Sequence, residues 1–342
     1  MLTCKGSQTE QGFVLPYVLV VIAILSAISI LGVNTIRERT ADLSVLIENH
    51  HVERAIEDAE EIVTYTFLTR PMTTRGLDVS DRFLDPSTIL PDLLPDESDV
   101  QDDDIWKATG ELRRLNIRGV TVDVFYRDIS GLISLNSASE SVIETWLSEN
   151  LEQPSLAKSL AAKLRDYRDP DNRRGFLGGE RADYRFRTMP PPSNSSLRSF
   201  DELRRVIDWE LTPVEFAKIL KHFSILPMAG RPALQWAPDD LVALYREEVG
   251  TVFSRGRPDL VDEVILNSRL PSEGARFIFF ANGQSGSPPL QRIVEFERTT
   301  GAPNLPRQRR TVADGVMLVD KREYLPDDDV KQLPVPRSSN DQ

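Results

Sequence analysis

The side chains best suited to chemistry in this sequence are carboxylates gathered between residues 166 and 180. Asp166, Asp169, Asp171 and Glu180 occur there, in a stretch that also contains three glycines. Carboxylate oxygens are the ligands that Ca²⁺ prefers, and glycine allows a loop to wrap around an ion. The stretch is therefore a candidate calcium site. Several arginines lie among these carboxylates, so ordinary ion pairing at the surface is the competing interpretation.

Other kinds of site lack their residues. The chain has one cysteine, Cys4, and three histidines, His50, His51 and His222. These are too few for a tetrahedral zinc site or a Cys–His nucleophile pair with its supporting groups. The sequence also contains no Gly-x-Ser-x-Gly turn around a serine and no glycine-rich phosphate loop ending in lysine. We predict that the protein is not an enzyme and that it requires no cofactor.

The charge balance points away from nucleic acid. The 342 residues carry a net charge of −12, with a pI near 4.9. A protein that binds DNA or RNA neutralises phosphates with clustered lysine and arginine, which an acidic chain supplies poorly. The balance suits a soluble surface, a divalent cation or a basic partner, and we predict no nucleic-acid partner.

A long apolar segment begins close to the start of the chain. No charged residue occurs from Phe13 to Val33, a stretch that would be about 31 Å long as a helix and would match the hydrocarbon core of a bilayer. We predict a membrane-spanning helix over 13–33. A cleaved secretory signal is the alternative, but no small-x-small cleavage pattern closes the run before Asn34. The flanking charges barely decide its orientation.

The pattern changes after the apolar segment. From 34 to 70 apolar residues recur at spacings of three, four and seven, with charged residues between them, which predicts an amphipathic helix that Pro71 ends. Residues 71–118 are expected to form a connector. It is rich in proline and acidic residues, and it carries no basic residue between Asp92 and Asp104.

Strand signals flank a helical block. Alternation of Val120, Val122, Val124 and Tyr126 with other residues predicts a strand, and a turn at Ser130-Gly131 predicts that 132–135 pair back as a second strand. Helices are then expected at 139–150, 154–167, 199–208, 212–222, 238–250 and 258–267, with a long loop at 168–198. Two further apolar strands surround a Gly/Ser/Pro turn near residue 285, and 315–325 are expected to add a third.

This order predicts an α+β fold in which a sheet is interrupted by an inserted all-helical domain. The sheet domain comprises 119–136 and 275–320, the insertion comprises 137–274, and 321–342 are expected to be disordered.

The junction between Gly12 and Phe13 resembles the class III signal of type IV pilin-like proteins. In that family a prepilin peptidase cuts after the glycine and the new N-terminal phenylalanine is methylated. The resemblance implies a cleaved leader at 1–12, a mature chain that begins at Phe13, and an antiparallel pilin-like sheet packed on a long N-terminal helix. Most members carry a glutamate at the position occupied here by Tyr17, and its absence is typical of the type II secretion protein K branch. A plain interfacial aromatic is the other interpretation of Tyr17.

Two later segments resemble the same branch. DISGLISLNSAS at 128–139 matches a hairpin of the form Asp-x-x-Gly-x-x-x-Leu-Asn-x-Ala, and the stretch 196–226 matches a later piece with a Thr-Pro pair. The resemblance implies a minor pseudopilin of type II secretion at or near the pseudopilus tip, which helps to initiate assembly and export. The implied partners are the other minor pseudopilins, the major pseudopilin and the prepilin peptidase. The implied location is the bacterial inner membrane, crossed once, with the C-terminal region periplasmic. Calcium binding by family members supports the carboxylate site.

Two alternatives stay open at this point. A minor pilin of a type IV pilus or a competence apparatus would share the same signal and insertion. A membrane-anchored helix-hairpin-helix protein that binds DNA is the other, but its connector at Val206–Leu211 has no glycine and contains Asp208 and Glu210. Acidic residues at that position would repel phosphate.

Overall fold

The computed structural model describes residues 14–80, 101–227, 232–245, 271–272, 274–281, 289–298, 306–316 and 331–334. The chain divides into two compact units. The first comprises Met1–His51 and Gln284–Ser287, and the second comprises Val52–Gly283 and Pro288–Gln342. The leader expected at 1–12, the end of the helix expected at 238–250 and the whole of the helix expected at 258–267 lie outside the described residues.

One helix, α1 (Val14–Thr69), covers both N-terminal segments that the sequence predicts to be helical. It ends before Pro71, as predicted. In the first unit the side chains from Tyr17 to Leu31 are all exposed. Among the residues whose placement is described, no helix is at once long and apolar enough to pass through a membrane.

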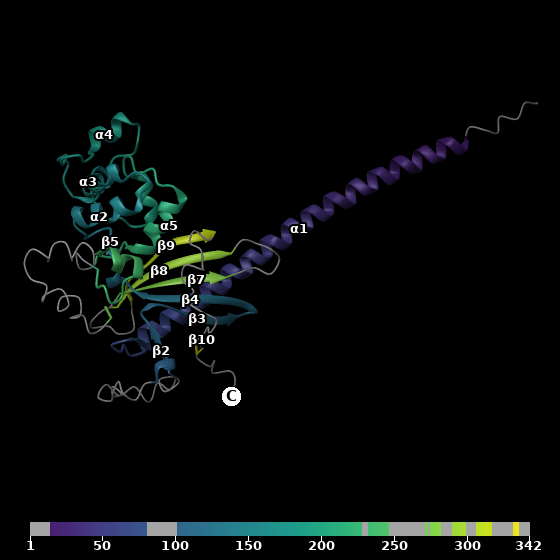
Figure 1. The fold of residues 1–342 in the computed structure, drawn as a ribbon. Coiled ribbons are helices and arrows are strands. Elements are labelled where there is room, and N and C mark those ends of the chain that lie inside the picture. Colours follow the sequence, from purple (N-terminus) through teal and green to yellow (C-terminus); the bar gives the residue numbers. More distant parts are fainter. Residues whose placement is uncertain are drawn as a thin grey trace, which may run out of the picture. The chain divides into compact units, whose positions relative to one another are not determined.

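In the second unit the last part of α1 lies against a sheet (Figure 1). Its buried residues follow helical spacing and are Val52, Ala55, Ile56, Ala59, Val63 and Phe67. Phe67 reaches an aromatic cluster, with its ring centroid 5.6 Å from that of Phe277, which in turn lies 5.1 Å from Tyr126. Aromatic side chains bury large areas, so this cluster is a principal attachment of α1 to the sheet.

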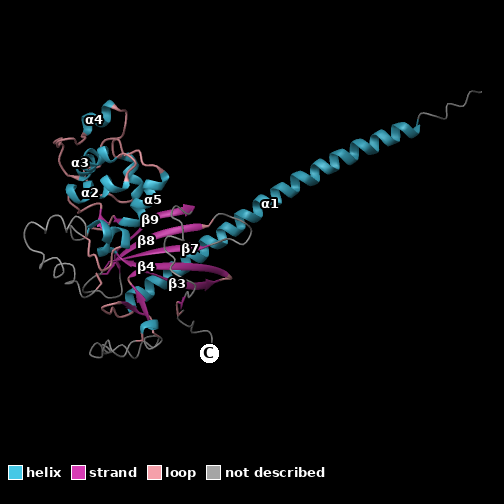
Figure 2. Ribbon diagram, viewed as in Figure 1, coloured by secondary structure: helices cyan, strands magenta, loops and turns pink. Residues whose placement is uncertain are grey.

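The sheet is mixed. Among the described residues it has six strands in the order β10-β3-β4-β7-β8-β9, in which only the β10–β3 pair is parallel. Figure 2 shows these strands beside the helical part of the unit. Their bounds are β3 (Thr109–Ile117), β4 (Val120–Asp128), β7 (Gly274–Ala281), β8 (Leu290–Arg298), β9 (Pro306–Val316) and β10 (Lys331–Gln332).

The two faces of the sheet serve two cores, because successive side chains of a strand point to opposite faces. On β7, Phe277 and Phe279 belong to the core shared with α1, whereas Ile278 and Phe280 belong to the core shared with the helices. Strand β7 is therefore apolar on both faces over most of its length, which explains the unbroken apolar run FIFFA at 277–281.

The helices predicted for the insertion are largely confirmed. They are α2 (Glu140–Asn150), α3 (Ala157–Arg168) and α5 (Pro213–His222), with a 3₁₀ turn at Pro154–Leu156 before α3 and further helix at 239–245. Ser139 caps α2 and Thr212 caps α5. Two differences occur: residues 200–205 form a 3₁₀ helix instead of the predicted α-helix, and α4 (Arg181–Phe186) lies in the predicted loop 168–198.

The prediction of a connector over 71–118 is wrong for much of that range. It contains β1 (Gly76–Asp78), β2 (Ile105–Lys107) and β3, which pairs with β4 along its whole length. The alternation of apolar and polar residues that would predict strand β3 is interrupted at Arg113, which is charged but buried. Its guanidinium donates to the carbonyl oxygens of Asp103 (2.9 Å) and Ile105 (2.7 Å), so the charge is satisfied without solvent.

The predicted pairing of 132–135 with 119–126 is also wrong. The strand β5 (Ile133–Ser134) pairs in parallel with β6 (Phe223–Ser224), and the neighbours of β4 are β3 and β7. The chain turns away because Ile129–Gly131 form a 3₁₀ turn that Asp128 caps by accepting from the Ser130 backbone N–H.

The C-terminal strands confirm one expectation and correct two. The pair β7–β8 is antiparallel, as predicted. The third strand is β9, which begins nine residues upstream of the predicted 315–325; residues 317–325 of that prediction lie outside the described residues. Of the tail expected to be disordered at 321–342, the structure describes only 331–334, and these are ordered: they include β10, the Leu333 backbone N–H donates to the Arg114 carbonyl oxygen (3.0 Å), and the Leu333 side chain is buried in the core with α1.

Candidate cation site and the motif around the insertion

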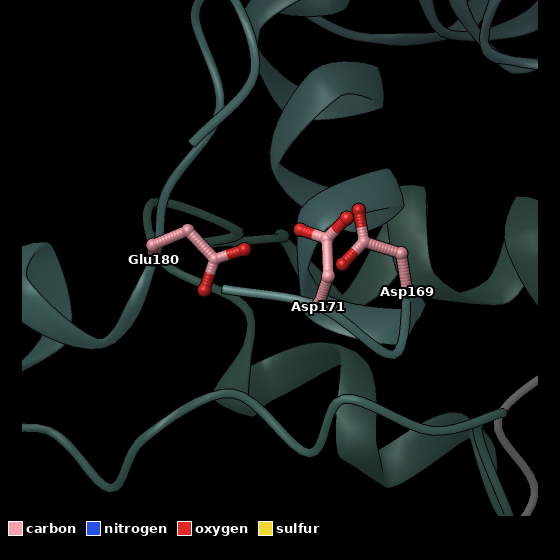
Figure 3. Close-up of side chains that lie close together, drawn as sticks. All are labelled: Asp169, Asp171 and Glu180. Atoms are coloured by element: carbon pink, nitrogen blue, oxygen red, sulfur yellow. The ribbon is translucent and has the colours of Figure 1, made fainter. Parts of the chain in front are cut away.

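Three of the four predicted carboxylates come together. Asp169, Asp171 and Glu180 offer ligand atoms that all lie within 4.8 Å of one another. Figure 3 shows the Glu180 carboxylate directed toward the two aspartates. Asp169 is the C-cap of α3 and Glu180 is the N-cap of α4, so the ends of two helices fix the group.

The fourth carboxylate, Asp166, has a different role. It is fully buried, its Oδ1 accepts from the Arg165 Nη2 (2.8 Å), and its Oδ2 accepts from the backbone N–H of Gly175 (2.9 Å). Gly178 packs so closely that an added Cβ would lie 1.8 Å from the Asp166 Oδ2. Asp166 therefore folds the loop between α3 and α4, and glycine is required where that loop passes it.

The three clustered carboxylates have little positive charge beside them. Both oxygens of Glu180 and the Oδ1 of Asp169 are shielded from solvent and lack a full hydrogen bond, although backbone N–H groups in the first turn of α4 face the Glu180 carboxylate. Burial raises the pKa of Glu180, and the negative charges of Asp166, Asp169 and Asp171 add to that effect. Burial and the charges of Asp171 and Asp166 raise the pKa of Asp169, against the opposing effect of Arg165. Hard oxygen donors at this separation, short of positive charge, fit a cation such as Ca²⁺.

Three of the arginines near this stretch have partners other than the clustered carboxylates. Arg165 also pairs with Glu140, Arg168 donates to the carbonyl oxygens of Leu135 and Ala138, and Arg174 pairs with Asp183 at 3.2 Å. Among the described residues, no ion pair forms with Asp169, Asp171 or Glu180. Ion pairing thus accounts for Arg165, Arg174 and Asp166, but leaves the three clustered carboxylates unmatched.

The remaining predicted site residues are at the N-terminus. Gly12 and Phe13 lie outside the described residues. Tyr17 lies on α1 in the first unit and is 70% exposed.

The motif at 128–139 marks where the chain enters the insertion. Asp128, the last residue of β4, accepts hydrogen bonds from the Ser272 hydroxyl (2.6 Å), the Ser272 backbone N–H and the Ser130 backbone N–H (2.7 Å). Ser272 stands just before β7, so one carboxylate joins the entry and the exit of the insertion. Gly131 leaves no room for a side chain, because an added Cβ would lie 2.3 Å from the Trp236 carbonyl.

Asn136 ties three segments of the insertion together. Its amide nitrogen donates to the carbonyl oxygens of Leu197 (3.0 Å) and Ile225 (2.6 Å), and its Oδ1 accepts from the Leu197 backbone N–H (2.8 Å). Sequence reasoning singled out the motif but not these roles. A half-buried asparagine that bonds the backbone of distant segments cannot be identified until the segments it joins are known.

Comparison with known proteins connects this region to a family. Residues 114–228 match the family model described as type II secretion system, protein K. No curated protein matches the chain. One similar solved structure is the crystal structure of the GspK-GspI-GspJ complex from the type 2 secretion system of enterotoxigenic Escherichia coli. The matching chain in it is 14% identical, with a TM-score of 0.47, and the match covers 81% of this chain and 99% of that chain.

Proposed function

We propose that this chain is a minor pseudopilin of type II secretion, in keeping with the match of residues 114–228 to the protein K family model, and that it sits at or near the pseudopilus tip and helps to initiate assembly and export. The observation that supports this most is the extent of the matched region. It runs from the end of β3 to the parallel β5–β6 pair, and it includes the helices α2 to α5 and Asp128, whose carboxylate joins the two ends of the insertion. The family is structural, and we propose no catalytic activity for this chain.

The partners we propose are the other minor pseudopilins and the major pseudopilin. The match of residues 114–228 to the protein K family model supports this proposal, because minor pseudopilins assemble with one another. The apolar side chains that α1 exposes in the first unit, such as Leu19, Leu25 and Ile28, suit packing against other apolar helices or lipid.

Pseudopilins are membrane-associated proteins, and we propose that this chain is anchored in the bacterial inner membrane by the apolar segment 13–33, with its C-terminal region periplasmic. A prepilin peptidase would cut between Gly12 and Phe13. The tip position rests on Tyr17, because a subunit with no neighbour beyond it has no use for a buried carboxylate at that place.

Mass spectrometry of the membrane-extracted protein tests the processing. We expect a mature chain that begins at an N-methylated Phe13, and a Gly12→Ala variant should keep its leader. Recovery of a soluble chain that begins after Val33 would contradict the proposal. The secretion role is tested separately, by deleting the gene and measuring exoprotein in the medium. Unchanged export would contradict the proposed role in secretion. Unchanged export together with lost twitching or DNA uptake would favour the type IV pilus alternative.

We also propose that Asp169, Asp171 and Glu180 hold Ca²⁺. The ion would offset two of the three negative charges and fasten the end of α3 to the start of α4, and it would take no part in a reaction. The unsatisfied buried oxygens of Glu180 support this proposal.

A further inference from the structure

The most exposed aromatic side chain among the described residues belongs to α4. Phe186 is 90% exposed at the end of this helix. The helix itself is held firmly, because Tyr184 is fully buried and its hydroxyl oxygen accepts from the Ile207 backbone N–H (3.0 Å). Its outer face is therefore presented by a fixed element and not by a loose loop.

The same helix carries two arginines without acidic partners. Arg181 and Arg185 are exposed, lie four residues apart and form no ion pair among the described residues. The nearby Arg174 and Arg187 do pair, with Asp183 and Asp208. Like charges at this spacing repel across one helical turn, so the arrangement costs the isolated protein stability. A partner with negative charge would remove that cost.

Apolar surface adjoins the two arginines. A hollow of about 520 Å³ is lined by Arg181, Arg185, Thr188, Met189, Pro190 and Pro191. Thr188 adopts a left-handed backbone (φ 58°), which is unusual for a β-branched residue and turns the chain so that Met189 and the prolines close the hollow. We name Arg181, Arg185, Phe186, Met189, Pro190 and Pro191 the α4 patch.

We propose that the α4 patch docks an acidic peptide segment of a partner protein, one that carries an apolar side chain beside two carboxylates. Guanidinium groups bind carboxylates in a bidentate manner, and arginine and aromatic residues are the side chains enriched at the centres of protein interfaces. The hollow between the arginines and the prolines would take the apolar side chain. This proposal goes beyond the proposed function, which assigns nothing to the α4 patch.

Charge complementarity selects this occupant. The chain as a whole carries −12, so an acidic partner is repelled elsewhere and is attracted to the few places where arginines stand unpaired. An anionic membrane is the other candidate surface. Lipid-binding patches use clusters of about 4–8 basic residues, more than the two unpaired arginines present here, and they need no shaped hollow.

Fluorescence polarisation with the full chain in detergent tests the proposal. The probe is a labelled peptide in which two carboxylates flank a leucine, Gly-Ser-Asp-Leu-Glu-Ser-Gly, and its control has Asn and Gln in place of Asp and Glu. We expect saturable binding of the acidic peptide alone, weakened at least about tenfold by R181E/R185E and by added salt, and weakened also by F186S. The variant R181K/R185K, which keeps the charge but loses the bidentate geometry, should bind with intermediate affinity.

The matched control is K158E/R198E, which changes the net charge equally at two other exposed positions and should leave binding unchanged. Equal weakening by both double variants would overturn the proposal, because the effect would then be one of net charge. Absence of saturable binding up to about 1 mM peptide would also overturn it. If vesicles of phosphatidylglycerol, and not the peptide, bind in a manner that depends on Arg181 and Arg185, the patch is a membrane surface and the peptide proposal is wrong.

Discussion

Arg276 on β7 and Glu295 on β8 form an ion pair with almost no exposure to solvent, on the face of the sheet that meets the helices. The Arg276 Nε lies 3.0 Å from the Glu295 Oε1, and the side chains are 1% and 0% exposed. Both also bind the insertion. Arg276 donates to the carbonyl oxygens of Leu220 (2.5 Å) and Phe223, and Glu295 accepts from the Ser224 hydroxyl (2.9 Å). The pair joins the sheet to the end of α5.

We predict that Arg276→Met lowers the free energy of unfolding by about 3–5 kcal/mol, because it leaves the Glu295 carboxylate buried without its counter-charge. Chemical denaturation of the full chain in detergent measures the change. The double variant R276M/E295M should recover much of the loss, since it removes both charges. A loss below about 1 kcal/mol for the single variant would mean that water reaches the pair.

Asn136→Ala should destabilise the insertion by about 2–4 kcal/mol. The substitution removes the three hydrogen bonds that the Asn136 side chain makes with the backbone of Leu197 and Ile225, each worth about 0.5–1.5 kcal/mol. The same denaturation measurement applies. Asn116→Ala is the matched control, because Asn116 is exposed on β3, and its effect should stay within about 0.5 kcal/mol. Similar losses for the two variants would argue against the role given to Asn136.

Stability should fall as the pH drops below about 6.5, the ordinary pKa of histidine. Burial lowers the pKa of His222, while Asp240, with its Oδ2 2.9 Å from the His222 Nε2, opposes that shift and Lys221 and Arg127 favour it. The Nδ1 accepts a hydrogen bond from the Trp146 Nε1 (3.0 Å), which requires that nitrogen to be unprotonated. The folded state thus disfavours the charged imidazole. The stabilisation that comes from holding His222 neutral is therefore fully present above pH 6.5, and it is lost as the pH falls toward the lower pKa that His222 has in the folded state.

Thermal unfolding between pH 7.5 and 5 measures this slope, which cannot exceed about 1.4 kcal/mol per pH unit for one group. His222→Gln should flatten it, whereas His51→Gln, at an exposed position on α1, should not. An unchanged slope in His222→Gln would place the titrating group elsewhere.

Isothermal titration with CaCl₂ should show binding to the full chain, and Glu180→Gln and Asp171→Asn should each weaken it at least about tenfold. Calcium should also raise the unfolding temperature, because the ion binds only the folded arrangement. Asp201→Asn, at an exposed aspartate outside the site, is the control. Absence of binding to the unaltered chain, or equal weakening by Asp201→Asn, would leave the carboxylates as an acidic surface.

Local pattern was sufficient for the elements whose periodicity is strong. The helical spacing through α1 and the Thr-Pro start of α5 are readable because capping and burial act on neighbours in sequence. Likewise β7 and β8 are two apolar runs around a turn, and they pair as predicted.

The elements that the sequence pattern did not predict depend on partners far away in the chain. Strand β3 carries Arg113 at a buried position, which is acceptable because the carbonyl oxygens of Asp103 and Ile105 accept its hydrogen bonds and Glu111 pairs with its charge at 3.3 Å. The β5–β6 pair is parallel and joins residues about ninety positions apart, so no local signal specifies it. For the site, the grouping of Asp169, Asp171 and Glu180 was expected, but the withdrawal of Asp166 by Arg165 and Gly175 was not readable from spacing.

The hydrogen bonds from Ser130 and Ser272 to Asp128 hold together the two ends of the insertion. Strands β4 and β7 are antiparallel neighbours whose ends meet where Asp128 faces Ala275, so a tight turn would suffice to connect them. The insertion therefore leaves and re-enters the sheet at one hairpin end, where Asp128 ties its two ends together. Because loop-closure entropy rises only slowly with length, the length of the insertion costs the sheet little stability. Its sequence is not independent of the sheet, since the residues that meet Arg276 and Glu295 must stay matched to that buried pair.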